Sequence, residues 1–138
     1  MERPGWSASG LNIDVLEVRW QIYAKEQKWD ACLDIANAII ELDRNRRSGW
    51  IDGAYALRRS AGGGLKAAFD ALLPAAEKFP LEPLIPLNLS CYACQMGRLE
   101  VACDWLRRTF AVAAKTGSKK RFRLMALHEP DWNRSGKR

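Results

Sequence analysis

The chain repeats one helix–turn–helix pattern about every 34 residues, and this period constrains its fold more than any other feature. A small residue near the start of the second helix of each unit recurs at Cys32, Ala68 and Ala102. The intervals between these positions are 36 and 34 residues. One such unit has too little apolar surface to fold by itself, so neighbouring units are expected to stack and share a core.

A second series of positions tests the period independently. A residue early in the first helix of each unit recurs at Leu16, Trp50 and Pro86, at intervals of 34 and 36 residues. A single insertion of two residues between Trp50 and Ala68 reconciles the two series, and the glycine-rich segment 60–64 lies in that interval. Both series therefore place the insertion in one loop, which the glycines also mark as a break between helices.

Apolar residues spaced three and four apart predict a succession of helices and no strand. Gly97 is expected to end one of these helices, because glycine tolerates the left-handed backbone of a helix C-terminus. Pro74 lies within the fourth pattern, where it is expected either to kink the helix or to shift its boundary. The expected helices cover about 13–27, 29–42, 50–57, 65–79, 88–96, 99–116 and 118–128.

These helices suggest one domain with a short flank on each side. Residues 1–11 form a flexible lead, residues 12–128 the domain and residues 129–138 a basic tail. Within the domain, repeats are expected at about 13–46, 47–82 and 83–116, followed by a capping helix at 118–128. A chain of 138 residues is long enough to bury the core of one such domain.

A set of small and large residues recurs at matching positions of the three units, most completely in the third. The set consists of Trp29, Cys32, Ala36, Trp50, Ala54, Ala68, Leu72, Ala75, Asn88, Leu89, Ser90, Gly97, Ala102 and Leu106. This pattern resembles the tetratricopeptide-repeat (TPR) family, in particular its small bacterial three-repeat members. The resemblance implies an all-α, right-handed superhelix of three helix–turn–helix repeats with a C-terminal capping helix. It further implies a non-enzymatic adaptor that binds a peptide or helix of a protein partner in its concave groove.

Trp20 departs from this pattern, because it stands where the later repeats carry Ala54 and Ser90. A large side chain at this position is expected to splay the first repeat or to cap the end of the superhelix. If exposed, Trp20 or Trp132 would provide a contact for a weak homodimer. Without such a contact the chain is expected to be a monomer.

In TPR proteins the first helix of each repeat lines the concave face, which implies a set of partner-binding residues here. By this resemblance they are Gln21, Lys25, Tyr55, Arg58, Arg59, Leu84, Asn88, Cys91 and Gln95. Arg58 and Arg59 are suited to accept a carboxylate, and Tyr55 offers a rigid anchor. Glu17 and Gln21 stand where the carboxylate clamp of chaperone-binding TPR domains begins with Lys and Asn. That clamp is therefore not expected.

The net charge of +6 is concentrated near the C-terminus. Residues 1–118 carry 15 Lys and Arg against 14 Asp and Glu, whereas residues 119–138 carry 7 against 2. The nearly neutral body does not indicate a domain that binds nucleic acid as a whole. A basic patch of Lys119, Lys120, Arg121 and Arg123 provides an alternative function, binding of nucleic acid or another acidic surface. The polar face that the end of a helical repeat needs for solubility accounts for the same patch.

The four cysteines are interpreted as packing residues and not as a metal or redox site. Cys91 and Cys94 have the spacing of a zinc ligand pair, with Cys103 nearby, but no second such pair follows. All four, including Cys32, lie in helical apolar patterns that are typical of buried free thiols. Neither a metal nor a cofactor is therefore expected.

No arrangement of nucleophile and base supports an enzyme, and the single histidine, His128, has no evident catalytic partner. No apolar run approaches the roughly 18 residues of a membrane span, and the first ten residues lack the apolar core of a signal peptide. A cytoplasmic protein is the resulting expectation. A secretion chaperone of the TPR type, which is similar in size and repeat number, is a further alternative.

Overall fold

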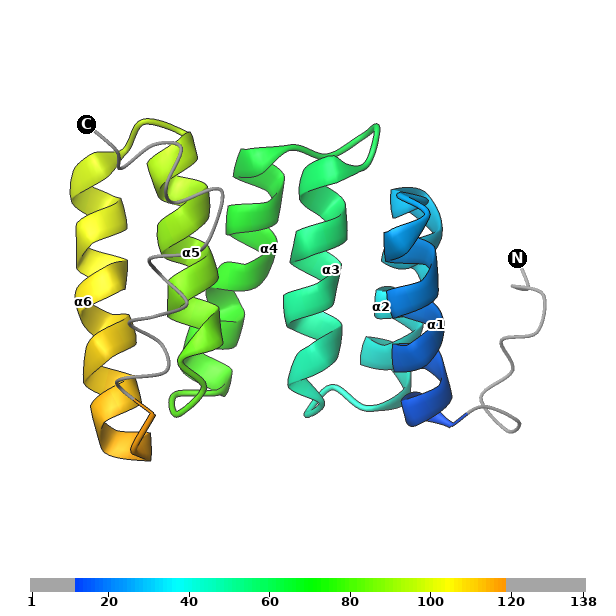
Figure 1. Ribbon diagram of the computed structural model, residues 1–138, viewed down its shortest axis with the longest axis horizontal. Helices are drawn as coiled ribbons and strands as arrows, with labels where there is room; N and C mark the ends of the chain where they lie inside the picture. Colours follow the sequence, from blue (N-terminus) through cyan, green and yellow to red (C-terminus); the bar gives the residue numbers. More distant parts are fainter. Residues whose placement is uncertain (1–11, 119–138) are drawn as a thin grey trace. The chain divides into compact units, whose positions relative to one another are not determined.

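The computed structural model describes residues 12–118, which form six α-helices and no strand (Figure 1). The all-α prediction is therefore confirmed for this part of the chain. The predicted lead, the capping helix beyond residue 118 and the basic tail lie outside the described residues. The helices are α1 (Ile13–Lys25), α2 (Trp29–Leu42), α3 (Arg47–Arg59), α4 (Leu65–Lys78), α5 (Leu84–Gln95) and α6 (Leu99–Thr116).

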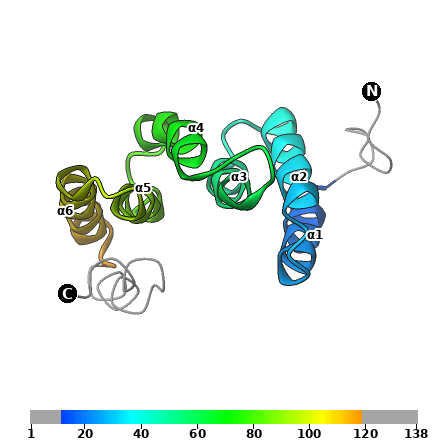
Figure 2. The same cartoon turned by 90° about the horizontal axis from the view of Figure 1, so that it is seen from above.

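The helices fall into two compact units, Met1–Gly64 with α1 to α3 and Leu65–Arg138 with α4 to α6. In the first unit α2 packs against both α1 and α3, and in the second unit α5 packs against both α4 and α6 (Figure 2). Packing of helices that are adjacent in the sequence is consistent with a helical repeat. The single domain, the superhelix and membership of the TPR family stay predictions.

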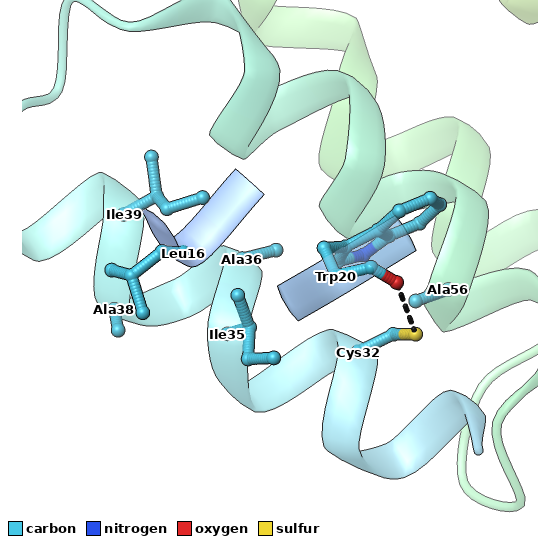
Figure 3. Packing of buried hydrophobic residues seen from close by; sticks show 8 residues of the cluster. All are labelled: Leu16, Trp20, Cys32, Ile35, Ala36, Ala38, Ile39 and Ala56. Carbon is cyan, nitrogen blue, oxygen red and sulfur yellow. Dashed lines mark hydrogen bonds between the residues drawn. The ribbon is translucent and has the colours of Figure 1, made fainter. Parts of the chain in front are cut away.

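Small residues bring α2 and α3 close together in the first unit. A Cβ atom on Gly49 would lie 2.8 Å from Cγ1 of Ile40, and one on Gly53 would lie 3.3 Å from Cβ of Ala36. Around this contact, large aliphatic side chains such as Leu16 and Ile35 are completely buried (Figure 3). The spacing of small and large residues in the sequence thus reappears as close packing of helices.

Trp20 belongs to the same core, in which it is 5% exposed (Figure 3). The Cys32 thiol donates a hydrogen bond to the main-chain carbonyl of Trp20, with 3.6 Å between sulfur and oxygen. The expectation that an exposed Trp20 mediates a homodimer is therefore wrong, because α2 and α3 cover the indole. Trp132, the other residue considered for that contact, lies outside the described residues.

In the second unit α5 is the most completely buried helix, since α4 and α6 both pack against it. It ends at Gln95, and Gly97 then adopts a φ angle of 81°. The amide of Arg98 donates to the carbonyl of Ala93 at 2.9 Å and closes the turn. The predicted helix end at Gly97 is confirmed. Pro74 lies inside α4, which continues to Lys78, so this proline does not mark a helix boundary.

The glycine-rich loop after α3 is confirmed as the break between α3 and α4. It is fastened to the end of α3, because the carbonyl of Leu57 accepts hydrogen bonds from the amides of Ser60 and Gly64, at 3.3 and 3.1 Å. A Cβ atom on Gly63 would lie 1.8 Å from that same carbonyl oxygen. Glycine at position 63 is therefore a requirement of the backbone path, and not only a sign of a flexible loop.

Candidate partner-binding surface of the first unit

Four side chains from three helices form one cluster in the first unit, here called the aromatic–arginine cluster: Trp20, Trp29, Tyr55 and Arg59. The Tyr55 ring lies 5.9 Å from the Trp20 ring in an edge-on geometry and 5.8 Å from the Trp29 ring, measured between ring centroids. Tyr55 is 37% exposed. The cluster therefore presents an aromatic surface that is anchored in the core through Trp20.

Arg59 stacks on the aromatic rings of this cluster. Its guanidinium carbon lies 3.9 Å from the centroid of Tyr55 and 5.3 Å from that of Trp29. Its Nη1 donates a hydrogen bond to the carbonyl of Tyr55 at 3.1 Å. A cation over an aromatic face is attracted by the ring quadrupole, so the guanidinium is held in a defined position before any partner arrives.

A cavity of about 360 Å³ opens beside the cluster. One wall comes from the turn between α1 and α2 and from the start of α2, and the other from the end of α3 and the loop that follows it. The lining residues are Gln27, Lys28, Trp29, Asp30, Ala31, Arg59, Ser60 and Ala61. Two members of the aromatic–arginine cluster, Trp29 and Arg59, thus also line this cavity.

A separate cluster of polar side chains joins α1 to the start of α3. The guanidinium of Arg46 donates to both carboxylate oxygens of Glu17 at 3.0 Å and to Asp14 at 2.6 Å. The hydroxyl of Ser48 also donates to Glu17. Hydrogen bonds from Arg46 and then Ser48 hold the pKa of Glu17 below its ordinary 4.5 despite partial burial. Glu17 is therefore engaged within the unit.

Asp52 stands one helical turn beyond Ser48 on α3 and has an unusual environment. Burial, and to a smaller extent the nearby charge of Glu17, raise its pKa from 3.8 to about 7. Burial, together with the charge of Asp52, also raises the pKa of the Cys32 thiol to about 11. Cys32 is consequently a protonated thiol at neutral pH, the form that is a poor nucleophile.

The sequence-derived candidates divide between the two units. In the first unit Gln21 and Lys25 are exposed on α1, and Arg58 is half-buried on α3, where Tyr55 and Arg59 belong to the cluster. In the second unit all the candidates lie on α5. They are Leu84, Asn88 and Gln95, which are half-buried, and Cys91, which is 4% exposed. A continuous groove over both units stays a prediction.

The structure adds two residues to the cluster that the sequence analysis did not select. In the sequence, Trp29 matches a repeat position and Trp20 departs from the repeat pattern. Both face Tyr55 from other helices, and only the packing of α1, α2 and α3 brings them together. The one available signal was the frequency of tryptophan, with six in the chain, of which three lie between residues 20 and 50.

The cysteines are free thiols, and three of them are buried as predicted: Cys32, Cys91 and Cys94. Cys103 is exposed on α6, so the prediction of a buried thiol is wrong there. Within residues 12–118, no group of three or more His, Cys, Asp or Glu is placed to hold a metal ion. The predicted basic patch, Lys119, Lys120, Arg121 and Arg123, lies outside the described residues.

Comparison with protein-family models gives no match for this chain, and comparison with curated protein sequences gives none either. None of the helices in residues 12–118 combines the length and the apolar character that crossing a membrane requires.

Proposed function

We propose that this protein is a non-enzymatic interaction module of the TPR-like helical-repeat type, which binds a peptide or helix of a protein partner. The observation that carries the proposal is the aromatic–arginine cluster of the first unit. Its exposed member, Tyr55, is held between two tryptophans, and Arg59 is stacked on its ring. Residues of these types dominate the binding energy of protein interfaces.

The rigidity of the cluster supports this proposal. Immobilising a long side chain on binding costs conformational entropy, about 0.5–1.5 kcal/mol, and this cost reduces the affinity that its contacts provide. Arg59 is already fixed by the carbonyl of Tyr55 and by two rings, so less of that cost remains. Packing of sequence-adjacent helices in each unit agrees with a repeat scaffold, and such scaffolds commonly serve as binding surfaces.

The chemistry of the buried groups favours binding over catalysis. The Cys32 thiol is protonated at neutral pH, and its sulfur donates to the carbonyl of Trp20. Asp52, which titrates near neutral pH, interacts electrostatically with Glu17 and with the protonated thiol of Cys32. These groups are better explained as parts of a helical core than as an acid–base pair acting on a substrate.

The proposal is tested by selecting ligands from a peptide library with the full chain and measuring their affinities for two variants. Tyr55→Ala is expected to weaken binding at least tenfold, because the central anchor is lost. Leu73→Ala removes a similarly exposed side chain from α4 and serves as the control with unchanged affinity. Peptides that bind Tyr55→Ala as tightly as wild type, with both variants folded by circular dichroism, would overturn the proposal.

A further inference from the structure

We propose that the cavity beside the aromatic–arginine cluster is a receptor for a carboxylate group of the partner peptide. This inference rests on the proposed function and adds to it the chemistry of the ligand. The cavity is formed within the first unit, by residues 27–31 and residues 59–61. The carboxylate comes either from an acidic side chain or from a peptide C-terminus.

The size of the cavity restricts its occupant. A volume of about 360 Å³ is at the lower end of the range for small-molecule sites. It admits one side chain or one chain terminus, whereas a helix needs a groove about 10 Å wide. A peptide that crosses Tyr55 is therefore expected to insert a single group here, because Trp29 and Arg59 belong to both the cluster and the cavity.

The charges of the residues that line the cavity favour a negatively charged group of the partner. Lys28 and Arg59 are basic, and Asp30 is the one acidic residue among the eight that line the cavity. The ammonium of Lys28 also lies 3.1 Å from Glu26, but this pair is well exposed and such pairs contribute little. The lining thus carries a net charge of +1 and suits a singly charged anion.

The geometry of Arg59 favours a planar ligand. A guanidinium presents its N–H donors in a plane that matches the two oxygens of a carboxylate. The rings of Tyr55 and Trp29 fix the position of this plane, at 3.9 and 5.3 Å from their centroids. A doubly charged phosphate fits less well, since the charge of Asp30 opposes it at the same cavity.

The test is an NMR titration of the full-length, ¹⁵N-labelled protein with four small compounds. N-acetylalanine carries a main-chain carboxylate, and the α-amide of N-acetylglutamate carries a side-chain carboxylate. The α-amide of N-acetylglutamine is the neutral control, and inorganic phosphate is the competing anion. Saturable shifts of the amides of residues 27–31 and 59–61 are expected with at least one of the two carboxylate compounds. The compound that binds more tightly shows whether the partner's carboxylate comes from a side chain or from a chain terminus.

Four variants assign these shifts to the cavity. Arg59→Gln is expected to weaken carboxylate binding at least tenfold, whereas Arg19→Gln, at an exposed position on α1 outside the cavity lining, is expected to leave it unchanged. Lys28→Gln, at an exposed position where folding is not at risk, is expected to weaken it about threefold. Asp30→Asn is expected to strengthen it by a similar factor, because the opposing charge is removed.

Several outcomes would overturn the inference. They are equal shifts with the neutral glutamine compound, saturation by phosphate alone, and carboxylate binding that survives both Arg59→Gln and Lys28→Gln. These compounds do not need Tyr55 as an anchor, so their binding is scored separately from peptide selection. Failure of the peptide screen with intact carboxylate binding would contradict the proposed function only, and the reverse result would contradict this inference only.

Discussion

Asp52 provides the sharpest test of how the first unit is packed. Its carboxyl has a pKa of about 7 in the folded protein, against an ordinary value of 3.8, because burial and then the charge of Glu17 disfavour the ionised form. Between these two values the folded state holds a proton that the unfolded state has released. The contribution of Asp52 to the free energy of unfolding must therefore fall as the pH rises from about 4 to about 7.

The magnitude follows from the difference between the two pKa values. Each pKa unit of difference corresponds to about 1.4 kcal/mol, so a gap of roughly three units sets an upper limit of about 4 kcal/mol on the loss of stability. Asp52 is half-buried, and solvent screening reduces this figure, so we expect about 1–3 kcal/mol. Asp52→Asn removes the charge and should make the protein more stable by this amount at pH 8. At pH 4.5, less than one unit above 3.8, the gain should be at most about 1 kcal/mol.

The assay is urea-induced unfolding, followed by circular dichroism, of wild type and variant at pH 4.5, 6 and 8. Asp34→Asn, at an exposed position on α2, is the matched control and should change stability by less than about 0.5 kcal/mol at every pH. A loss of stability in Asp52→Asn at pH 8 would refute the reasoning. A gain that is the same at all three pH values would also refute it, because the effect must follow ionisation.

Other substitutions test the backbone path, a buried hydroxyl and the thiols. Gly63→Ala should destabilise the protein by more than about 2 kcal/mol, because its Cβ would collide with the carbonyl of Leu57. Gly62→Ala meets no atom within 4 Å and should be neutral or slightly stabilising in the same urea assay; equal effects of the two alanines would contradict this account. Ser90→Ala should stabilise the protein by about 1 kcal/mol, since the Ser90 hydroxyl is buried without a hydrogen-bond partner within residues 12–118. A clear loss of stability would contradict that reason. Titration with a thiol reagent should modify one cysteine rapidly in the native protein, Cys103, and all four in denaturant; two or more rapid reactions would show that the buried thiols are accessible.

Helix positions were largely predictable from the sequence, because they depend on local patterns. Apolar spacing placed α2 and α6 at their observed limits, and the loop at residues 60–64 was marked by its glycines. Gly97 ends α5 because a positive φ angle suits glycine. The predicted start of the third helix was three residues late, since Arg47 and Ser48 carry no apolar signal and yet form the first turn of α3.

Contacts between distant residues were not predictable in the same way. Arg46 bonds Glu17 and Asp14 across 29 and 32 residues, a separation that no helical spacing indicates. Trp20 appeared too large for its position, because the sequence does not show that residues of α2 and α3, among them Cys32 and Ala56, enclose it in a core. Burial in a core depends on the shape of the neighbouring helices, and this emerges only once they pack.

The candidate site was predictable in part. Tyr55 and Arg59 were selected because they lie on the first helix of a repeat, and the structure places them together. Trp29 and the cavity beside it were missed, since they depend on the start of α2 approaching the end of α3. The repeat pattern thus located one wall of the site, and tertiary packing supplied the other.

Hydrogen–deuterium exchange of the full chain, with and without a peptide selected for binding, tests the central claim most directly. Our account predicts slower exchange in the presence of the peptide at residues 27–31 and 55–61, which carry Trp29, Tyr55 and Arg59. Tyr55→Ala should abolish that protection under the same conditions. Protection confined to α5 and α6, or to residues beyond 118, would contradict the account, because the partner would then bind away from the aromatic–arginine cluster.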